Sequence, residues 1–326
     1  MASLSIDLIS MVNRFRVWAL TFRGSITLFC LLGLLLVPLT GNEYLTTIII
    51  TSMILAIFAA SWDLLAGFAG QVSFGHSAFF GIAGYVTAAF VRFLGHHWVI
   101  ALLAGAGMAV VFSLLIGIPC LRLKGPYLAL GTLAFSLVLY RLFLTGTWLG
   151  GTEGISGLPR AENPYLVFYA IAGFMVVSLV AMRAIADSRL GTVMKAIRDD
   201  ELCADASGIN TTVYKLLAFM ISGFFAGIAG AIFVLDTTAV NPAIYQPLYS
   251  FYAIIMASIG GIATIYGSII GAFLFIILSE VLRPLAAAAL LIFAALLILI
   301  IRFAEEGVMN PVLEKVQELY DKIRGR

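Results

Sequence analysis

The chain has 326 residues, of which 62% are apolar and only 11% are charged, and its mean hydropathy is +1.08. A soluble globular domain averages about 45–50% apolar and about 25% charged residues, so this composition excludes a soluble globular protein and indicates an integral membrane protein. The net charge of +2 is spread along the chain rather than gathered in blocks, which gives no basis for binding nucleic acid.

The sequence lacks the motifs of common enzymes. No Gly-Lys pair occurs, so the phosphate-binding G-x-x-x-x-G-K-[ST] loop is absent and we do not expect the chain to hydrolyse ATP. Neither H-E-x-x-H nor G-x-S-x-G occurs. Cys30, Cys120 and Cys203 lie far apart and indicate neither a disulfide framework nor a metal cluster. We therefore predict a protein that is not an enzyme and has no cofactor or metal of its own.

Apolar runs long enough to span a bilayer, about 20 residues each, follow one another along the chain. The first comes after Arg14, Arg16 and Arg23, and because no small-residue cleavage site follows it, we interpret it as an uncleaved span. The run at 248–262 is short and could be tilted, broken or partly interfacial. We predict an all-α polytopic membrane protein, a single transmembrane domain over 1–326, with about ten transmembrane helices at 26–39, 44–65, 77–94, 98–118, 127–144, 166–182, 214–235, 248–262, 265–282 and 286–303.

The distribution of basic residues orients these spans. With the N-terminus placed inside, 15 of the 19 Lys and Arg residues fall in inner segments. The outer ends keep only Arg92, Arg141, Arg160 and Arg283. Because cytoplasmic segments carry the excess of basic residues, both termini are predicted to be cytoplasmic.

A Gly-rich and polar stretch at 66–84 interrupts the apolar pattern between two spans. Gln71, Ser73 and His76 lie within it, and such an interruption at membrane depth is tolerated where backbone is buried in protein or lines a water-filled cavity. The stretch is interpreted either as the wall of a translocation pathway or as a tight inner hairpin. Asp63 just before it either faces the pathway or accepts hydrogen bonds from backbone amides.

Two longer polar segments separate later spans. Residues 149–164 are rich in Gly and Pro and predict an outer loop without a helix. Residues 183–215 form the longest hydrophilic stretch between spans, and their charge predicts a cytosolic location. Met194, Ile197, Glu201 and Ala204 recur there at three- and four-residue steps, which predicts one short helix that ends near Gly208.

Small residues at four-residue spacing, Gly223 with Gly227 and Gly267 with Gly271, allow close helix packing. We expect this packing within the chain, with contact to a partner membrane subunit as the alternative. The tail at 304–326 has one apolar helical face and is expected to lie on the inner membrane surface or to dock on a cytosolic partner.

Four motifs, taken together and in this order, resemble the LivM-type permease subunit of branched-chain amino-acid ABC importers. The resemblance extends from about residue 55 to residue 311 and rests on the motifs at 68–81 (FAGQVSFGHSAFFG), 121–130 (LRLKGPYLAL), 150–159 (GGTEGISGLP) and 188–219, which contains SRLG, AIRDDE and YKLLAF.

This resemblance implies a location in the inner cell membrane and a set of partners. They are a second related permease, two cytosolic ATPase subunits that bind ATP and Mg, and an external solute-binding protein. It also implies that 183–215 contains the coupling loop, whose short helix sits in a groove of an ATPase. Leu202 and Cys203 replace the usual small residues there, and Asp63 stands where relatives commonly carry Asn. The residues expected to couple the permease to the ATPase are Arg198, Glu201, Ala204, Asp205 and Gly208.

The leading hypothesis is therefore a permease that forms half of the pathway for branched-chain or other hydrophobic amino acids. Asp63, Gln71, Ser73 and His76 are the candidate polar groups of that pathway. Urea, short amides or small aromatic acids are the alternative cargo. An ion-coupled secondary transporter that uses Asp63 and His76, or a membrane scaffold without transport, would be a different class of protein.

Overall fold

The structure, a computed structural model, describes residues 36–95, 97–123, 125–160 and 163–283. The predicted span at 286–303 and the tail at 304–326 lie outside the described residues, as does the span at 26–39 except for its last four residues. Residues 36–49 belong to one compact unit, which contains η1 (Val37–Thr40) and the start of α3 (Glu43–Asp63). Residues 50–283 belong to a second unit, and the site described below lies wholly within it.

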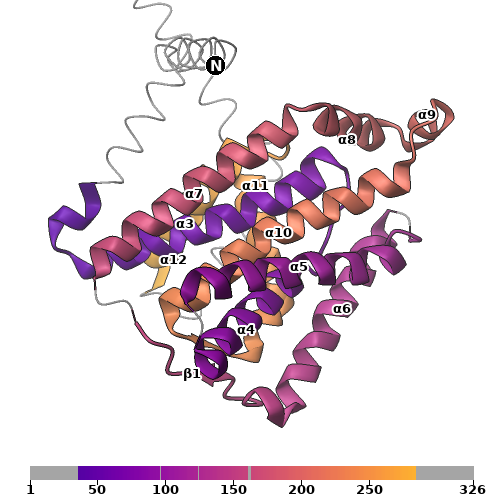
Figure 1. The fold of residues 1–326 in the computed structure, drawn as a ribbon. Coiled ribbons are helices and arrows are strands. Elements are labelled where there is room, and N and C mark those ends of the chain that lie inside the picture. The colour runs from indigo at the N-terminus through magenta and orange to yellow at the C-terminus, as the bar shows by residue number, and fades with distance from the viewer. Residues whose placement is uncertain (1–35, 96, 124, 161–162, 284–326) are drawn as a thin grey trace, which may run out of the picture. The chain divides into compact units, whose positions relative to one another are not determined.

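Each of the eight predicted spans that lie in the described residues is a helix (Figure 1). Seven of the described helices are long and apolar enough to cross a membrane, which confirms a polytopic membrane protein; the total of ten stays a prediction. α11 has only 14 residues, as the short run at 248–262 indicated. Besides α3, these helices are α4 (Ser77–Leu94), α5 (Trp98–Cys120), α6 (Pro126–Thr145), α7 (Pro164–Ala186), α10 (Thr211–Thr237), α11 (Pro247–Gly260) and α12 (Ile265–Leu282).

Local sequence signals set where several of these helices begin and end. Asn163 accepts hydrogen bonds from the backbone amides of Tyr165 and Leu166, and Pro164 stands at the first turn of α7, where its missing N–H costs nothing. Asn210 caps α10 in the same way. Gly95, with a φ of +63°, ends α4 in the left-handed conformation that glycine adopts most readily.

α10 lies at the centre of the described helices and packs most extensively against α4 and α5. A Cβ at Gly223 would lie 2.8 Å from Ser113 Cβ, and one at Gly227 would lie 2.7 Å from Ala109 Cβ, so these glycines let α10 approach α5 closely. The prediction that this pair packs within the chain is confirmed.

α11 and α12 form a hairpin that is packed through the second pair of glycines. A Cβ at Gly267 would overlap the backbone of Gly260, and a Cβ at Gly271 would overlap the carbonyl oxygen of Met256. This pair also packs within the chain, as predicted.

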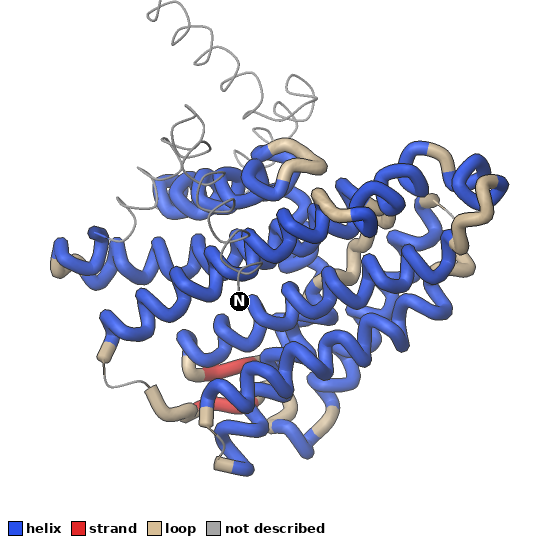
Figure 2. Tube along the Cα trace, turned by 45° about the horizontal axis from the view of Figure 1, so that its top comes forward, coloured by secondary structure: helices blue, strands red, loops and turns tan. Residues whose placement is uncertain are grey.

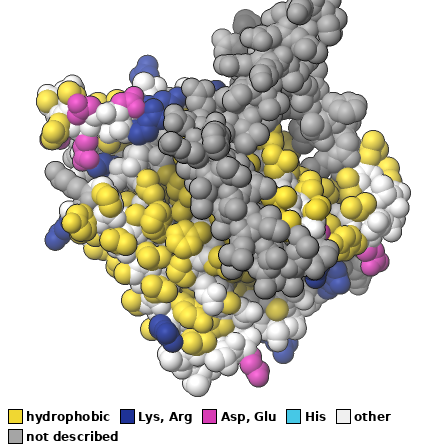
Figure 3. All heavy atoms as spheres, turned by 180° about the vertical axis from the view of Figure 1, so that it is seen from behind, with side chains coloured by type: hydrophobic (Ala, Val, Ile, Leu, Met, Phe, Trp, Pro, Cys, Tyr) yellow, Lys and Arg dark blue, Asp and Glu magenta, His cyan; other side chains and the backbone are white. Residues whose placement is uncertain are grey.

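The outward faces of several helices are apolar. Leu103, Val111 and Leu115 on α5 are more than half exposed, as are Leu130 and Val138 on α6. Apolar side chains cover much of the described surface in Figure 3, and charged side chains gather toward its margins. An apolar face of this kind suits contact with lipid or with another membrane subunit.

One short pair of strands departs from the all-α expectation. β1 (Ile155–Ser156) pairs antiparallel with β2 (Ala239–Val240), as the red segments of Figure 2 show. η3 (Thr147–Leu149) precedes β1, and η4 (Pro242–Tyr245) follows β2. The described residues between η3 and Asn163 contain no helix, which agrees with the loop predicted at 149–164.

The prediction of one short helix before Gly208 was wrong. The structure has two helices, α8 (Arg189–Asp199) and α9 (Glu201–Ala206). Asp200 between them is extended, with a φ of −155°, and its carboxylate accepts a hydrogen bond from the amide of Cys203, so it caps a new helix instead of continuing the first. Gly208, with a φ of +83°, marks the end of α9, as predicted.

Candidate functional site

The Gly-rich interruption predicted at 66–84 is present as a break in helical structure. α3 continues into η2 (Leu64–Phe68), a short π-helical segment, and the chain then stays non-helical until α4 begins at Ser77. Gly70 has a φ of +69°, which turns the chain out of the helix. We call residues 69–76 the break.

The last residue of the break, His76, lies near the middle of α10 rather than near one of its ends. His76 Nε2 is 2.9 Å from Ser61 Oγ, and Ser222 of α10 donates a hydrogen bond of 2.7 Å to the carbonyl of Ser61. At 1.5 Å per residue, Ser222 is about 16 Å from the start of α10 and about 22 Å from its end. The end of the break at His76 therefore lies beside the middle of a helix that is long enough to span a membrane, whereas Gly70 at its start approaches Arg198 of α8.

Side chains of neighbouring helices bind the polar backbone groups of the break. Phe74 N donates to Thr132 Oγ1 of α6 at 3.1 Å, and Trp62 Nε1 of α3 donates to the carbonyl of Ser73 at 2.8 Å. Gly75 lies so close to the carbonyl of Thr132 that a Cβ would overlap it. Non-helical backbone inside a membrane protein needs such partners, and here α3 and α6 supply the side chains that bind the break.

Asp63, a predicted pathway residue, is fully buried at the end of α3. Its Oδ1 accepts a hydrogen bond of 2.7 Å from the amide of Ala263, which has a φ of +63° in the turn between α11 and α12. The residue thus binds a backbone amide, as one of the two sequence-based interpretations had it, but the amide is 200 positions away.

Ser73 and His76 are fully buried among packed side chains. The His76 ring lies 5.2 Å from the Phe58 ring and 5.5 Å from the Phe79 ring, measured between centroids. Among the described residues, neither Ser73 Oγ nor His76 Nδ1 has a hydrogen-bond partner. These two side chains therefore lie behind the exposed surface of the break.

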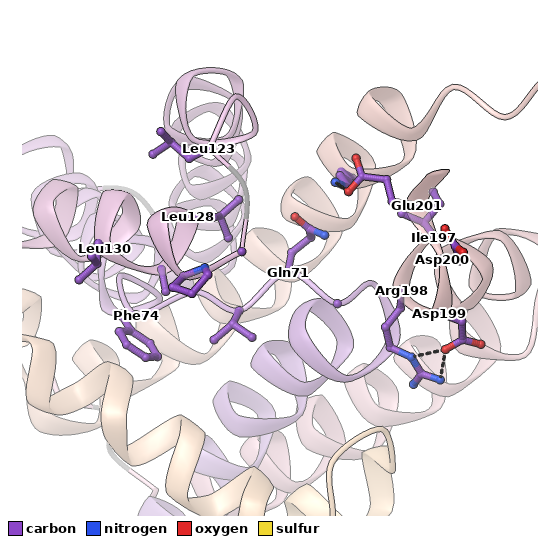
Figure 4. A pocket seen from close by; sticks show the side chains of 16 residues that line it. Gln71, Phe74, Leu123, Leu128, Leu130, Ile197, Arg198, Asp199, Asp200 and Glu201 are labelled. Carbon is purple, nitrogen blue, oxygen red and sulfur yellow. Dashed lines mark hydrogen bonds and ion pairs between the residues drawn. The ribbon is translucent and has the colours of Figure 1, made fainter. Parts of the chain in front are cut away.

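Gln71 borders a cavity of about 680 Å³ that joins the break to α8 and α9. Figure 4 shows Gln71 between the apolar side chains of α6 and the charged side chains of the α8–α9 junction. Val72, Phe74 and Leu128 line the apolar side. Asp63, Ser73 and His76 are not among the residues that line this cavity.

Arg198 on α8 points toward the break. Its Nη1 donates a hydrogen bond of 2.7 Å to the carbonyl of Gly67 in η2, while Nε and Nη2 bind Asp199 at 3.0 and 2.8 Å. Nζ of Lys195, one turn earlier, lies 5.2 Å from the Phe68 ring centroid. Helix α8 is therefore held against the end of the helix that precedes the break.

The other predicted coupling residues lie on or just after α9. Glu201 pairs with Lys215 of α10. Ala204 is buried, whereas Asp205 and Gly208 are exposed. Leu202 on the same helix, between Glu201 and Cys203, is 77% exposed.

Asp200 and Cys203 influence each other at the start of α9. Hydrogen bonding to the Cys203 amide lowers the pKa of Asp200. The hydrogen bond and the negative charge of Asp200 raise the pKa of the Cys203 thiol. Cys203 therefore favours its protonated form although it is exposed.

Comparison with known proteins identifies the family. The model of the branched-chain amino acid transport system permease component matches residues 44–301. The chain belongs to this permease family. The permease is 27% identical over 290 residues to the high-affinity branched-chain amino acid transport system permease protein LivM of Escherichia coli (strain K12), which covers 79% of this chain and 68% of that protein. It is also 27% identical over 201 residues to the autoinducer 2 import system permease protein LsrC of Yersinia enterocolitica, covering 56% and 55%. No solved structure matches the permease.

A cluster of serines that the sequence did not single out joins the break to the rest of the permease. Ser77 N donates to Ser250 Oγ at 2.8 Å, and Ser77 Oγ lies 3.0 Å from Ser136 Oγ. Ser136 in turn donates to the carbonyl of Tyr245 at 2.5 Å. All three serines are fully buried, so they connect the starts of α4 and α11 with α6 and η4. Single serines in separate apolar spans carry no signal that they meet.

Proposed function

We propose that this permease forms half of the translocation pathway of an ATP-binding-cassette importer for branched-chain or other hydrophobic amino acids. The observation that carries the proposal is the cavity shared by the break and the α8–α9 region. A transporter driven by another subunit needs a segment that the other subunit can move and a pathway that this movement opens. Here the proposed moving segment, α8 and α9, and the proposed pathway along the break line the same cavity.

The inner part of the pathway is proposed to follow the exposed side of the break. Val72, Phe74 and Leu128 give an apolar wall, and Gln71 supplies an amide. Such a wall suits brief contact with an apolar side chain and does not hold the cargo tightly. Ser73, His76 and Asp63 would act from behind this wall by holding the break and the α11–α12 turn in place.

α8 and α9 are proposed to dock on one of two cytosolic ATPase subunits. Leu202, between Glu201 and Cys203, presents an exposed apolar side chain that would fill a small hydrophobic groove on the ATPase. Asp205 and Gly208 are exposed beside it and are available to the same partner. ATP and Mg would be bound by the ATPase subunits, and this chain would hydrolyse none.

The remaining features of the assembly follow from this proposal. A second related permease would complete the pathway, and an external solute-binding protein would deliver the cargo to the face opposite α8 and α9. The permease would lie in the inner membrane with both termini in the cytoplasm. The likeness to LivM covers more of the chain than the likeness to LsrC, which favours an amino acid as cargo.

The test is uptake by the complete transporter in proteoliposomes. We expect labelled leucine, isoleucine or valine to accumulate only when the binding protein, the second permease and ATP on the ATPase side are all present. Uptake of urea, acetamide or benzoate in place of these would reassign the cargo. Uptake by the permease alone on a proton or sodium gradient would refute the proposal and favour a secondary transporter.

A further inference from the structure

Gly67 is the point at which three distant parts of the chain meet. Its carbonyl accepts the hydrogen bond from Arg198 of α8. A Cβ on Gly67 would overlap Oδ1 of Asp63 and lie 2.6 Å from the amide nitrogen of Ala263. One residue of η2 therefore touches both α8 and the carboxylate that holds the α11–α12 turn.

Gly70 makes the approach of Arg198 possible. A Cβ at Gly70 would lie 2.9 Å from Arg198 Cγ and 3.2 Å from Arg198 Cα, and its φ of +69° also disfavours other residues. Of the two glycines in the sequence Ala-Gly-Phe-Ala-Gly at 66–70, Gly67 thus approaches both the α11–α12 turn and α8, whereas Gly70 makes room for Arg198.

The contact from α8 uses the planar guanidinium group of Arg198. A guanidinium presents several N–H donors in a fixed plane, so Arg198 can bind Gly67 and Asp199 at once. Lysine has a compact ammonium group on a flexible stem and would lose the fixed orientation.

We propose that Arg198 is a positioning residue that connects α8 to the α11–α12 turn through Gly67 and Asp63, in addition to the covalent links of the coupling loop to α7 and α10. The proposal rests on the proposed function, because it assumes that an ATPase moves α8. A displacement of α8 then moves η2 through the hydrogen bond from Arg198 to the carbonyl of Gly67. The movement of η2 reaches the α11–α12 turn through the hydrogen bond between the Asp63 carboxylate and Ala263. In this way the movement reaches a hairpin that has no direct covalent link to α8.

The experiment follows the turn itself in the complete transporter. Ile262 is 53% exposed beside Ala263, so Ile262→Cys can be labelled with a maleimide in a chain whose Cys30 and Cys203 are replaced by serine; Cys120 is buried. We expect a non-hydrolysable ATP analogue to change the labelling rate several-fold. Arg198→Ala should abolish this change and raise the ATP hydrolysed per solute transported. Arg189→Ala, which removes another exposed arginine of α8, should leave both unchanged.

The outcomes separate this inference from the proposed function. If the parent transporter imports its cargo but the ATP analogue still changes the labelling rate in Arg198→Ala, the connection is refuted while the importer stands. The same holds if the analogue does not change the labelling rate in the parent. If ATP drives no uptake, the proposed function fails first. Should Arg198→Ala not assemble, Arg198→Lys provides the same test with the positive charge retained, and an unchanged labelling response in that variant would also refute the connection.

Discussion

Nζ of Lys215 lies 2.5 Å from Oε2 of Glu201, so an acid that the sequence assigned to the ATPase contact is already paired within its own chain. The Lys215 side chain is only 10% exposed and the Glu201 side chain 43%. The pair attaches the first turn of α9 to the base of α10.

Reversing one charge of this pair should destabilise the α8–α9 region, and reversing both should restore it. Glu201→Lys places two ammonium groups together and should cost about 1–2 kcal/mol of folding free energy, between the values for exposed and buried pairs. Thermal unfolding in detergent and solute-stimulated ATP hydrolysis measure the effect. If the double variant with Lys215→Glu regains stability but not hydrolysis, Glu201 also contacts the ATPase directly.

Asp63→Asn should be tolerated, whereas Asp63→Leu should not. Asparagine keeps an oxygen that can accept the hydrogen bond from Ala263, while leucine leaves that amide without an acceptor at a cost of about 1–3 kcal/mol. Unfolding temperature and ATP-driven uptake of both variants provide the comparison. A large loss of uptake in Asp63→Asn with unchanged stability would show that the carboxylate charge itself serves transport.

Leu202→Ser should weaken binding of the ATPase subunit without affecting the fold of the permease. Burying one leucine contributes about 1.5–3 kcal/mol, so the dissociation constant should rise about tenfold or more. The matched control is Leu166→Ser, which removes another exposed leucine (61%). Leu166 lies in the first turn of α7, at the end that is far from α8. Equal binding by both variants, measured with the purified ATPase, would remove Leu202 from the interface.

The serine cluster should be sensitive to the loss of one hydroxyl. Ser77→Ala leaves Ser136 and Ser250 each without one of their partners and should lower the free energy of unfolding by about 1–3 kcal/mol. Ser113→Ala is the control, because among the described residues the hydroxyl of Ser113 bonds only to the carbonyl of Val110 in its own helix. Similar unfolding temperatures for the two variants would mean that the cluster adds no stability.

The pKa shifts at the start of α9 predict the reactivity of Cys203. Because Asp200 raises the pKa of the thiol, less thiolate is present at pH 8, and iodoacetamide should react slowly. Asp200→Asn keeps a helix-capping side chain but removes the charge, so alkylation should accelerate. The comparison is made in a Cys30→Ser background, with both rates measured again in denaturant, where they should converge.

As the pH falls through the lowered pKa of Asp200, the stabilisation from its ionised cap should be lost.

The spans were predictable from the sequence because each is a local property of composition. Apolar runs of sufficient length placed all eight helices of the described residues that were expected to cross the membrane, and the Gly-rich stretch located the break. The contacts at the site could not be predicted in the same way. Asp63 and Ala263 are 200 positions apart, and Arg198 and Gly67 are 131 positions apart, so no local pattern records that they meet.

The end of α8 shows a different limit of sequence reasoning. Helical spacing continues from Met194 to Ala204 and indicates one helix. Asp200, however, is a residue type that is unfavourable inside a helix and favourable as an N-cap. In the structure Asp200 caps α9, and Glu201 on the new helix pairs with Lys215 of α10. Periodicity on one segment contains no information about that partner.

α10 contains 27 residues in one uninterrupted helix, with Lys215 near its first turn and the strand β2 just past its last. β2 is bonded to β1, so this helix is anchored to a surface loop at one extremity and to α9 at the other. A displacement of α9 is therefore expected to reach β2, and through it β1, along one helix that is about 40 Å long.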